Sequence, residues 1–444
     1  MDKLPSPIGP SALIPLLSGC RAQFAKGLAG NASPWALTSV FPRLARELNL
    51  VPKMKNIKLG DTVLLLSSIG GFSAPGDPWD LFHTIPRRVL ESLVLGTVAF
   101  DCSRAQNRLK GLLEDGPGVY VLGLAISGRN GQFLNAIEMN ALVHNLELYM
   151  HGCEVLLDPL HVITAADRSA IDFVFRVDTA YGDATPGVPR FICDEENQKA
   201  AKYLLSSFCA RRDAMQTADP TGTVYTIQSP QYVGCGKDVG KRIGAYKLGH
   251  QKTALDGANK FFALTVSLLH RQRLKPEVHI VTAIRTWKPG QLSKAEILVA
   301  ALAGSYVTQD GFNLRDAGGN HDGPDVSPRS WFRHEEYIFG AVDHFAKNVE
   351  WSSRDLKKLA ELEKHIEVLA AADDGTLEQA KDRCEAGVDS VNAKLEQLAQ
   401  HADDVEAAQM GQAEMVAALQ RQEDMLVAAL DLIGELRDVV TIDE

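Results

Sequence analysis

The feature that most constrains the fold is a seven-residue apolar repeat near the end of the chain. From Leu377 to Val440 every seventh residue is apolar, with Gln412 as the single exception. The other positions of the repeat are Cys384, Val391, Leu398, Val405, Leu419, Leu426 and Ile433. A period of seven keeps these side chains on one side of an α-helix, where another helix must cover them. The repeat therefore predicts a coiled coil or a helix hairpin.

A second helix is predicted just before this repeat. Its apolar residues follow a 3-4-3 spacing, at Leu359, Leu362, Ile366 and Leu369. The pattern Ser352-Ser353-Arg354-Asp355 is typical of a capping box and is predicted to begin this helix. A turn signal at 373–375 and a second capping-box pattern at 376–379 separate it from the repeat. Residues 351–444 are therefore predicted to form a C-terminal helical module.

This module can pair with a second copy of the chain or fold back on its own body. Association is the preferred interpretation, because no apolar stripe of similar length occurs elsewhere in the chain. The residues predicted to mediate it are Leu377, Val391, Leu398, Val405, Leu419, Leu426 and Ile433.

The charge of the chain is divided unevenly between the module and the rest. The formal net charge is −10, yet residues 351–444 hold 9 Lys and Arg against 22 Asp and Glu. Residues 1–350 hold the remaining 37 basic and 34 acidic residues. The acidity therefore belongs to the module, and the body is slightly basic.

Composition narrows the class of protein. No apolar run approaches the roughly 18–20 residues that span a bilayer, so no membrane partner is expected. The seven cysteines contain no CxxC pair, which indicates reduced thiols and a cytoplasmic location. Seven is also an odd number, which argues against a complete disulfide framework.

Residues 56–350 are predicted to form a mixed globular body, preceded by a proline-rich arm and a helix in 1–55. Strand-like runs occur at 62–66, 119–127, 154–158, 172–177, 223–228 and 277–284. Helix-like stretches occur at 34–50, 133–149, 196–212, 253–274, 293–303 and 333–348. This mixture predicts a helix-rich α+β fold.

The densest chemical feature of the body is the basic segment 237–288. It holds 11 Lys and Arg against 3 Asp and Glu, with interspersed glycines and aromatic residues. Cations hold phosphates, and unpaired bases stack on aromatic or Arg planes. The predicted nucleic-acid-binding residues are Lys237, Lys241, Arg242, Lys247, Arg271, Arg273, Lys275, Arg285, Trp287 and Lys288. Alternatively, the segment is a solvated face that pairs with the acidic module.

Motifs for catalysis and for metal or cofactor binding are weak. Gly234–Lys241 resembles a phosphate-binding loop but has the wrong glycine spacing, and Arg242 stands where Ser or Thr should hold Mg²⁺. His144, His151 and Cys153 lie close in sequence, and a metal site with Asp158 and His161 would have to be assembled by folding. No catalytic, metal or cofactor residue is therefore predicted.

The preferred hypothesis is a non-enzymatic, self-assembling structural protein that binds nucleic acid, with RNA as the preferred partner, such as a viral nucleocapsid or coat protein located in the cytoplasm or the virion. One alternative is an oligomeric α/β enzyme in which the polar loop 308–330 is a lid over His321, Asp322 and His334. A protein-interaction scaffold is a third.

Overall fold

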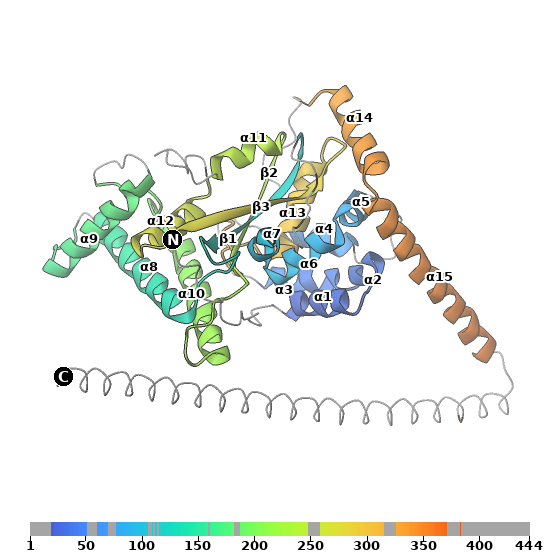
Figure 1. Ribbon diagram of the computed structural model, residues 1–444, viewed down its shortest axis with the longest axis horizontal. Helices are drawn as coiled ribbons and strands as arrows, with labels where there is room; N and C mark the ends of the chain where they lie inside the picture. The colour runs from blue at the N-terminus through green and yellow to red at the C-terminus, as the bar shows by residue number, and fades with distance from the viewer. Residues whose placement is uncertain are drawn as a thin grey trace, which may run out of the picture. The chain divides into compact units, whose positions relative to one another are not determined.

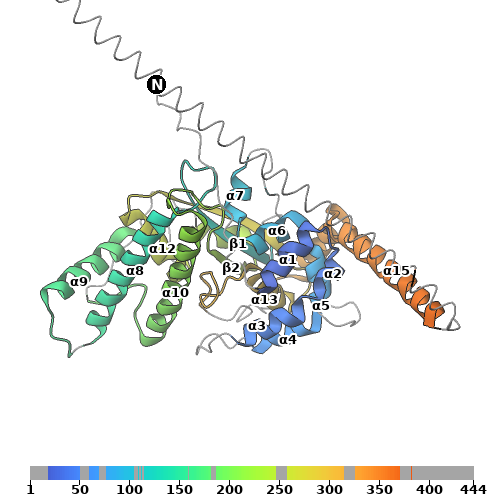
Figure 2. The same ribbon diagram turned by 90° about the horizontal axis from the view of Figure 1, so that it is seen from below.

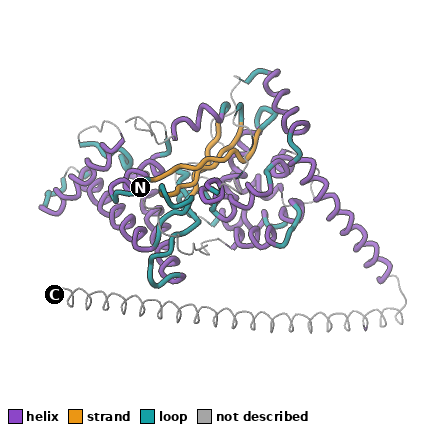
Figure 3. Tube along the Cα trace, viewed as in Figure 1, coloured by secondary structure: helices purple, strands orange, loops and turns teal. Residues whose placement is uncertain are grey.

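The computed structural model describes residues 19–50, 60–69, 77–104, 109, 112, 115–158, 160–181, 187–246, 258–314, 326–370 and 382. Contacts divide the chain into two units, Met1–Leu356 and Lys357–Glu444. The described residues are mostly helical and include one small sheet, which confirms the predicted helix-rich α+β class (Figure 3). None of the described helices is long and apolar enough to cross a membrane.

The helices lie in three runs along the chain (Figure 1). Before the first strand come α1 (Gly19–Ala29), α2 (Pro34–Thr38), α3 (Phe41–Asn49), α4 (Gly60–Ile69), α5 (Asp77–Thr84), α6 (Arg87–Leu95) and α7 (Val98–Ser103). Between the strands come α8 (Ala136–Leu157), α9 (Ala165–Asp178), α10 (Glu195–Ala218), α11 (Val239–Ile243) and α12 (Lys260–Arg271). After them come α13 (Gln291–Ala303), α14 (Pro328–Glu336) and α15 (His344–Ala370).

The sheet has three antiparallel strands in the order β2-β1-β3. Its strands are β1 (Gly118–Ile126), β2 (Gln231–Gly236) and β3 (Pro276–Arg285). Gly118 at the start of β1 pairs with both Gly236 and Arg285. The last residues of β2 and β3 therefore lie at the same end of the sheet, and β3 starts at the opposite end.

The two faces of the sheet are covered by different helices. On one face the ring of Tyr120 packs near Tyr246, which follows α11, and Tyr246 contacts Phe262 of α12. Side chains alternate along a strand, so Gly123 faces the other way. A Cβ on Gly123 would meet the backbone of Ala99 at 2.8 Å, which places α7 close against that second face.

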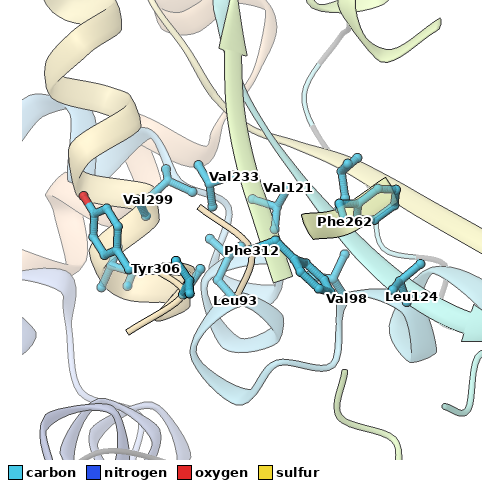
Figure 4. Close-up of a cluster of buried hydrophobic side chains, with 14 of the residues drawn as sticks. Leu93, Val98, Val121, Leu124, Val233, Phe262, Val299, Tyr306 and Phe312 are labelled. Atoms are coloured by element: carbon cyan, nitrogen blue, oxygen red, sulfur yellow. The ribbon is translucent and has the colours of Figure 1, made fainter. Parts of the chain in front are cut away.

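The core joins the sheet to the helices on both sides. Figure 4 shows Val121 and Val233 of the strands among Val98 of α7, Phe262 of α12 and Val299 of α13. α13 is buried along nearly its whole length. In Figures 1 and 2 helices α8–α10 and α12 lie on one side of the sheet, and α1–α6 lie on the other.

Two of the predicted strands were correct and four were not. β1 and β3 match the runs 119–127 and 277–284, whereas 62–66, 154–158 and 172–177 lie in α4, α8 and α9, and 223–228 forms no strand. Capping boxes at Asn135 and Thr164 begin α8 and α9, and the two helices then pack together closely at Gly152. Helix packing thus overrode the local β-branched composition.

The predicted lid loop is wrong for its first part. Phe312 and Asn313 are buried, and the Asn313 side chain bonds both the N–H and the C=O of Val233 at 3.0 and 2.7 Å. Phe312 N–H donates to the carbonyl of Gln231. This segment therefore covers the outer edge of β2, and its backbone pairing explains why so polar a stretch is ordered. His321 and Asp322 lie outside the described residues.

The predicted helix start at Ser352 is also wrong, because α15 begins at His344. Ser352 is buried, accepts a hydrogen bond from the N–H of Trp35 at 3.0 Å and contacts Nε2 of His83 at 2.9 Å. Asn348 donates to the carbonyls of His83 and Ile85. Polar contacts thus hold the first part of α15 against the N-terminal helices. The predicted repeat from Leu377 lies outside the described residues.

Candidate nucleic-acid interface

The register of the sheet separates the basic segment into two clusters. The first, here the entry cluster, is Arg271, Arg273 and Lys275, between the end of α12 and the start of β3. The second, the exit cluster, lies around the ends of β2 and β3 and comprises Lys237, Lys241, Arg242, Arg285 and Lys288. The ten residues of β3 set the two roughly 30 Å apart. Lys247 lies outside the described residues, so the predicted single groove is not formed by the described cations.

Arg285 and Trp287 do not belong to a binding surface, because both are buried. Arg285 donates to the carbonyl of Gly116 at 2.9 Å and contacts Nδ1 of His334 at 3.0 Å, and burial lowers its pKa to about 10. The ring of Trp287 packs edge-on against Phe339. These two residues connect the end of β3 to α14 and the turn after it.

Lys241 and Arg242 of the exit cluster have different contacts. Lys241 forms an ion pair with Asp238 at 3.5 Å. Arg242 lies close to Tyr120, Tyr246 and Tyr232. Burial alone would lower its pKa, but the interactions with these three tyrosines together raise it. The phosphate-loop resemblance of this stretch is not supported, because Asp238 uses its carboxylate to cap α11 through the N–H of Lys241.

The entry cluster has a different character. Arg271, Arg273 and Lys275 are all exposed, and none of them forms an ion pair with another described residue. They occupy every second position from 271 to 275, so three positive charges lie within five residues, between the last residue of α12 and the first residue of β3. An exposed, uncompensated cation can bind a phosphate without first breaking an internal contact.

Arg273 adopts a backbone conformation that usually requires glycine. Its φ is +62°, and it ends α12 in a Schellman motif: Arg273 N–H donates to His270 O, and Leu274 N–H donates to Leu269 O. A side chain in this left-handed region is strained. Arg273 therefore holds this conformation at a cost in strain that glycine would not have.

One cation near the entry cluster was missed by the sequence analysis. Arg129 lies in the loop after β1, where Ser127 N–H donates to the carbonyl of Lys275. Its guanidinium donates to both carboxylate oxygens of Glu138 at 2.7 Å and stacks on Tyr225. Arg129 is therefore engaged with its own chain, and no sequence signal distinguished it from the cations of the entry cluster.

The geometry at His334 argues against a serine–histidine pair. Ser330 Oγ lies 3.2 Å from Nε2 of His334, while Nδ1 faces the Arg285 guanidinium at 3.0 Å. Arginine only donates hydrogen bonds, so Nδ1 must accept and Nε2 must carry the proton. Burial and Arg285 also lower the pKa of His334. A protonated Nε2 cannot take the proton of Ser330. The Ser330–His334 contact lies within α14, and the Arg285–His334 contact joins α14 to the end of β3.

The histidines that were considered for a metal site are arranged as a carboxylate clamp. His151 and His161 contact opposite oxygens of Asp167 at 2.9 and 3.1 Å, whereas His144 is exposed and Cys153 is buried on α8. Hydrogen bonds from Thr164 and the two histidines hold the pKa of Asp167 well below its usual range. Among the described residues no group of His, Cys, Asp and Glu is placed to hold a metal ion.

Comparisons of the chain with protein-family models, with curated proteins and with solved structures found no match.

Proposed function

We propose that this protein binds nucleic acid through the entry cluster and associates with copies of itself through its C-terminal helical module, as a subunit of a nucleocapsid-like assembly does. The observation that carries the proposal is the set of three exposed cations, Arg271, Arg273 and Lys275, with no ion pair in the described part of the chain. Lys and Arg neutralise phosphates without reading sequence, so binding at this cluster is sequence-tolerant. RNA is the preferred partner.

Binding at the entry cluster is expected to depend steeply on salt. Three phosphate contacts to a single strand should lower the affinity by about 20-fold between about 50 and about 200 mM salt. The variant R271E/R273E/K275E should lose most of the affinity and flatten the salt dependence by about 2 in the slope of log K against log salt. Fluorescence anisotropy with labelled single-stranded RNA, and with DNA of the same sequence, measures both quantities.

The control is K26E/R46E/K199E, which makes the same charge change at exposed residues of α1, α3 and α10. This variant should keep the affinity of the unmodified protein apart from a small general loss. Equal losses in the two triple variants would show that net charge, not the entry cluster, decides binding.

Replacing Arg273 by glycine separates binding from stability. R273G should stabilise the folded state by about 0.5–1 kcal/mol, because glycine adopts the left-handed conformation without strain. It should also weaken RNA binding several-fold, because one phosphate contact is lost. Urea unfolding and anisotropy on the same sample test both. A loss of stability in R273G would show that the arginine side chain has a structural role instead.

Self-association is supported by the exposed apolar residues of α15. Leu362 and Ile366 are 58% and 64% exposed although they belong to the predicted stripe. From Lys357 to Ala370 the helix extends roughly 21 Å, whereas a continuous helix from Leu377 to Val440 would extend roughly 96 Å. α15 of the same chain is therefore too short to cover the whole predicted repeat. This favours a second copy of the chain as the partner of the repeat.

The variant L362E/I366E in the full chain is expected to reduce the molar mass measured by light scattering toward that of a single chain. Charged residues cannot be buried unpaired in a helix seam. The variant K357E/K364E changes exposed residues of the same helix and serves as control. An unchanged molar mass in L362E/I366E would show that these residues do not lie in an interface between chains.

A further inference from the structure

Cys193 and Lys260 form a contact that the proposed function does not use. Cys193 lies immediately before Asp194, the N-cap of α10, and Lys260 is the first residue of α12. The Nζ of Lys260 lies 3.1 Å from Sγ of Cys193. Lys260 is exposed and Cys193 is half-buried, so solutes can reach the sulfur while the ammonium stays next to it.

Other polar groups also face this sulfur. Nδ2 of Asn197 donates to it at 3.8 Å, and the thiol itself donates to the carboxylate of Asp194 at 3.7 Å. The Asp194 carboxylate is itself held by the N–H of Asn197 at 2.7 Å, which with other contacts lowers its pKa. The ammonium of Lys260 and the amide of Asn197 are thus both donors toward the sulfur, and the nitrogen of Lys260 lies within reach of a group that forms on it.

Four of the other five described cysteines have different surroundings. Cys20, Cys153 and Cys235 are buried, and burial raises the pKa of Cys20 to about 12 and holds those of the other two higher still. Cys209, within α10, is half-buried too, but burial raises its pKa, and the charged groups that act on it are Arg212, Glu147 and Asp213 rather than a lysine of the described residues. Cys209 is therefore a reference thiol of similar exposure within the same molecule.

We propose that Cys193 is a site of reaction with hydroperoxides and that Lys260 captures the oxidised sulfur as a sulfenamide. The thiolate attacks the outer peroxide oxygen, so that an S–O bond forms, the O–O bond breaks and the sulfur loses two electrons. The departing alkoxide or hydroxide takes a proton from the Lys260 ammonium and leaves a neutral amine beside the sulfenic acid.

That amine completes the reaction. Its lone pair attacks the sulfur, an N–S bond forms, the S–O bond breaks, and the hydroxyl leaves as water with a proton from the nitrogen. Sulfenic acids condense with nitrogen in this way, and here the two atoms start 3.1 Å apart. The product is a covalent link between the start of α10 and the start of α12, and thiols can reduce it.

The test treats the full-length protein with one equivalent of hydrogen peroxide, alkylates the remaining thiols, and maps the peptides by mass spectrometry. The expected product joins the peptide of Cys193 to that of Lys260, with the loss of two hydrogen atoms, and disappears with dithiothreitol. Cys209 should remain alkylated in the same sample. Oxidation of Cys193 no faster than that of Cys209 would overturn the proposal.

The variant K260M tests the capture step, with K199M, an exposed lysine of α10, as control. In K260M the cross-link should be lost, and a dimedone adduct should accumulate on Cys193 because its sulfenic acid has no amine to react with. K199M should behave like the unmodified protein. A K260M protein in which Cys193 gives the same products as before would exclude Lys260 as the capturing group.

Discussion

Replacing Arg211 by methionine is expected to destabilise the folded state by about 3–5 kcal/mol, the cost of breaking a buried ion pair from one side. Arg211 is 1% exposed and donates to the carboxylate of Asp310 and to the carbonyl of Gln228. Asp310 also accepts from Ser207 at 3.2 Å. The pair thus links α10 to the segment after α13, and its loss leaves Asp310 without its closest counter-charge.

A second arginine moderates this effect. Arg21 is buried and donates to the carbonyl of Val94. Burial lowers its pKa to about 10, and Arg21 interacts electrostatically with both Asp310 and Arg211. Arg21 remains near Asp310 in the variant, so we expect a loss toward the lower end of the range. Urea unfolding followed by circular dichroism measures it.

The next residue of the chain provides the control. Arg212 pairs with Asp213 at the surface, at 2.8 Å, and such pairs contribute about 0–1 kcal/mol. R212M should therefore unfold almost like the unmodified protein. R211M/D310L should recover part of the loss, because the whole Arg211–Asp310 pair is removed, although Arg21 then loses the attraction of Asp310. Equal stability of R211M and R212M would refute the assigned role of the buried pair.

Lowering the pH from 6.5 to 4 is expected to remove about 3 kcal/mol of stability through His83 alone. The ring is fully buried. Its Nδ1 lies 2.9 Å from the carbonyl of Trp79, so Nδ1 carries the proton, and Nε2 accepts from the hydroxyl of Ser352 at 2.9 Å. These two hydrogen bonds fit the neutral form of the His83 ring, and burial lowers the pKa of His83 to about 4.

The direction of the effect follows from proton binding. Between about pH 6.5, the usual pKa of histidine, and pH 4 the unfolded chain binds a proton that the folded chain does not. The stability that neutral His83 contributes is therefore complete above pH 6.5 and decreases as the pH falls toward 4. Protonation of His83 is expected to weaken the packing of the first part of α15, because Ser352, which bonds the ring, belongs to that helix.

The measurement compares the free energy of unfolding of the unmodified protein and of H83Q at several pH values between 4 and 7. H83Q is less stable at neutral pH, but its stability should decrease less steeply on acidification. H144Q changes an exposed histidine of α8, and its profile should follow that of the unmodified protein. Parallel profiles for H83Q and the unmodified protein would contradict the assignment.

Local composition was sufficient for some elements and misleading for others. β1 and β3 are long, largely apolar runs that contain β-branched residues, and they were predicted with nearly their observed bounds. β2 was missed because Gly234 and Gly236 weaken its strand signal. The tertiary structure explains the glycine at position 234, because a Cβ there would lie 2.5 Å from the hydroxyl of Tyr120 on the neighbouring strand.

The candidate site shows the same division. Composition alone identified Arg271, Arg273 and Lys275 as cations in a basic segment, but it could not separate them from Arg285, which is as basic and lies ten residues further along the chain than Lys275. The separation comes from β3, whose length sets the clusters apart, and from His334 and Gly116, which bury Arg285.

The sequence by itself determined which stretches are amphipathic, where the charge lies, and that the body mixes helices with a few strands, because these follow from the order of apolar and polar residues along the chain. Only the tertiary structure decided which cations stay exposed, which histidines are neutral, and that a polar segment pairs with β2. Burial and pairing depend on residues far apart in sequence, such as Asp310 with Arg211 and Ser352 with His83, and no local pattern specifies such contacts.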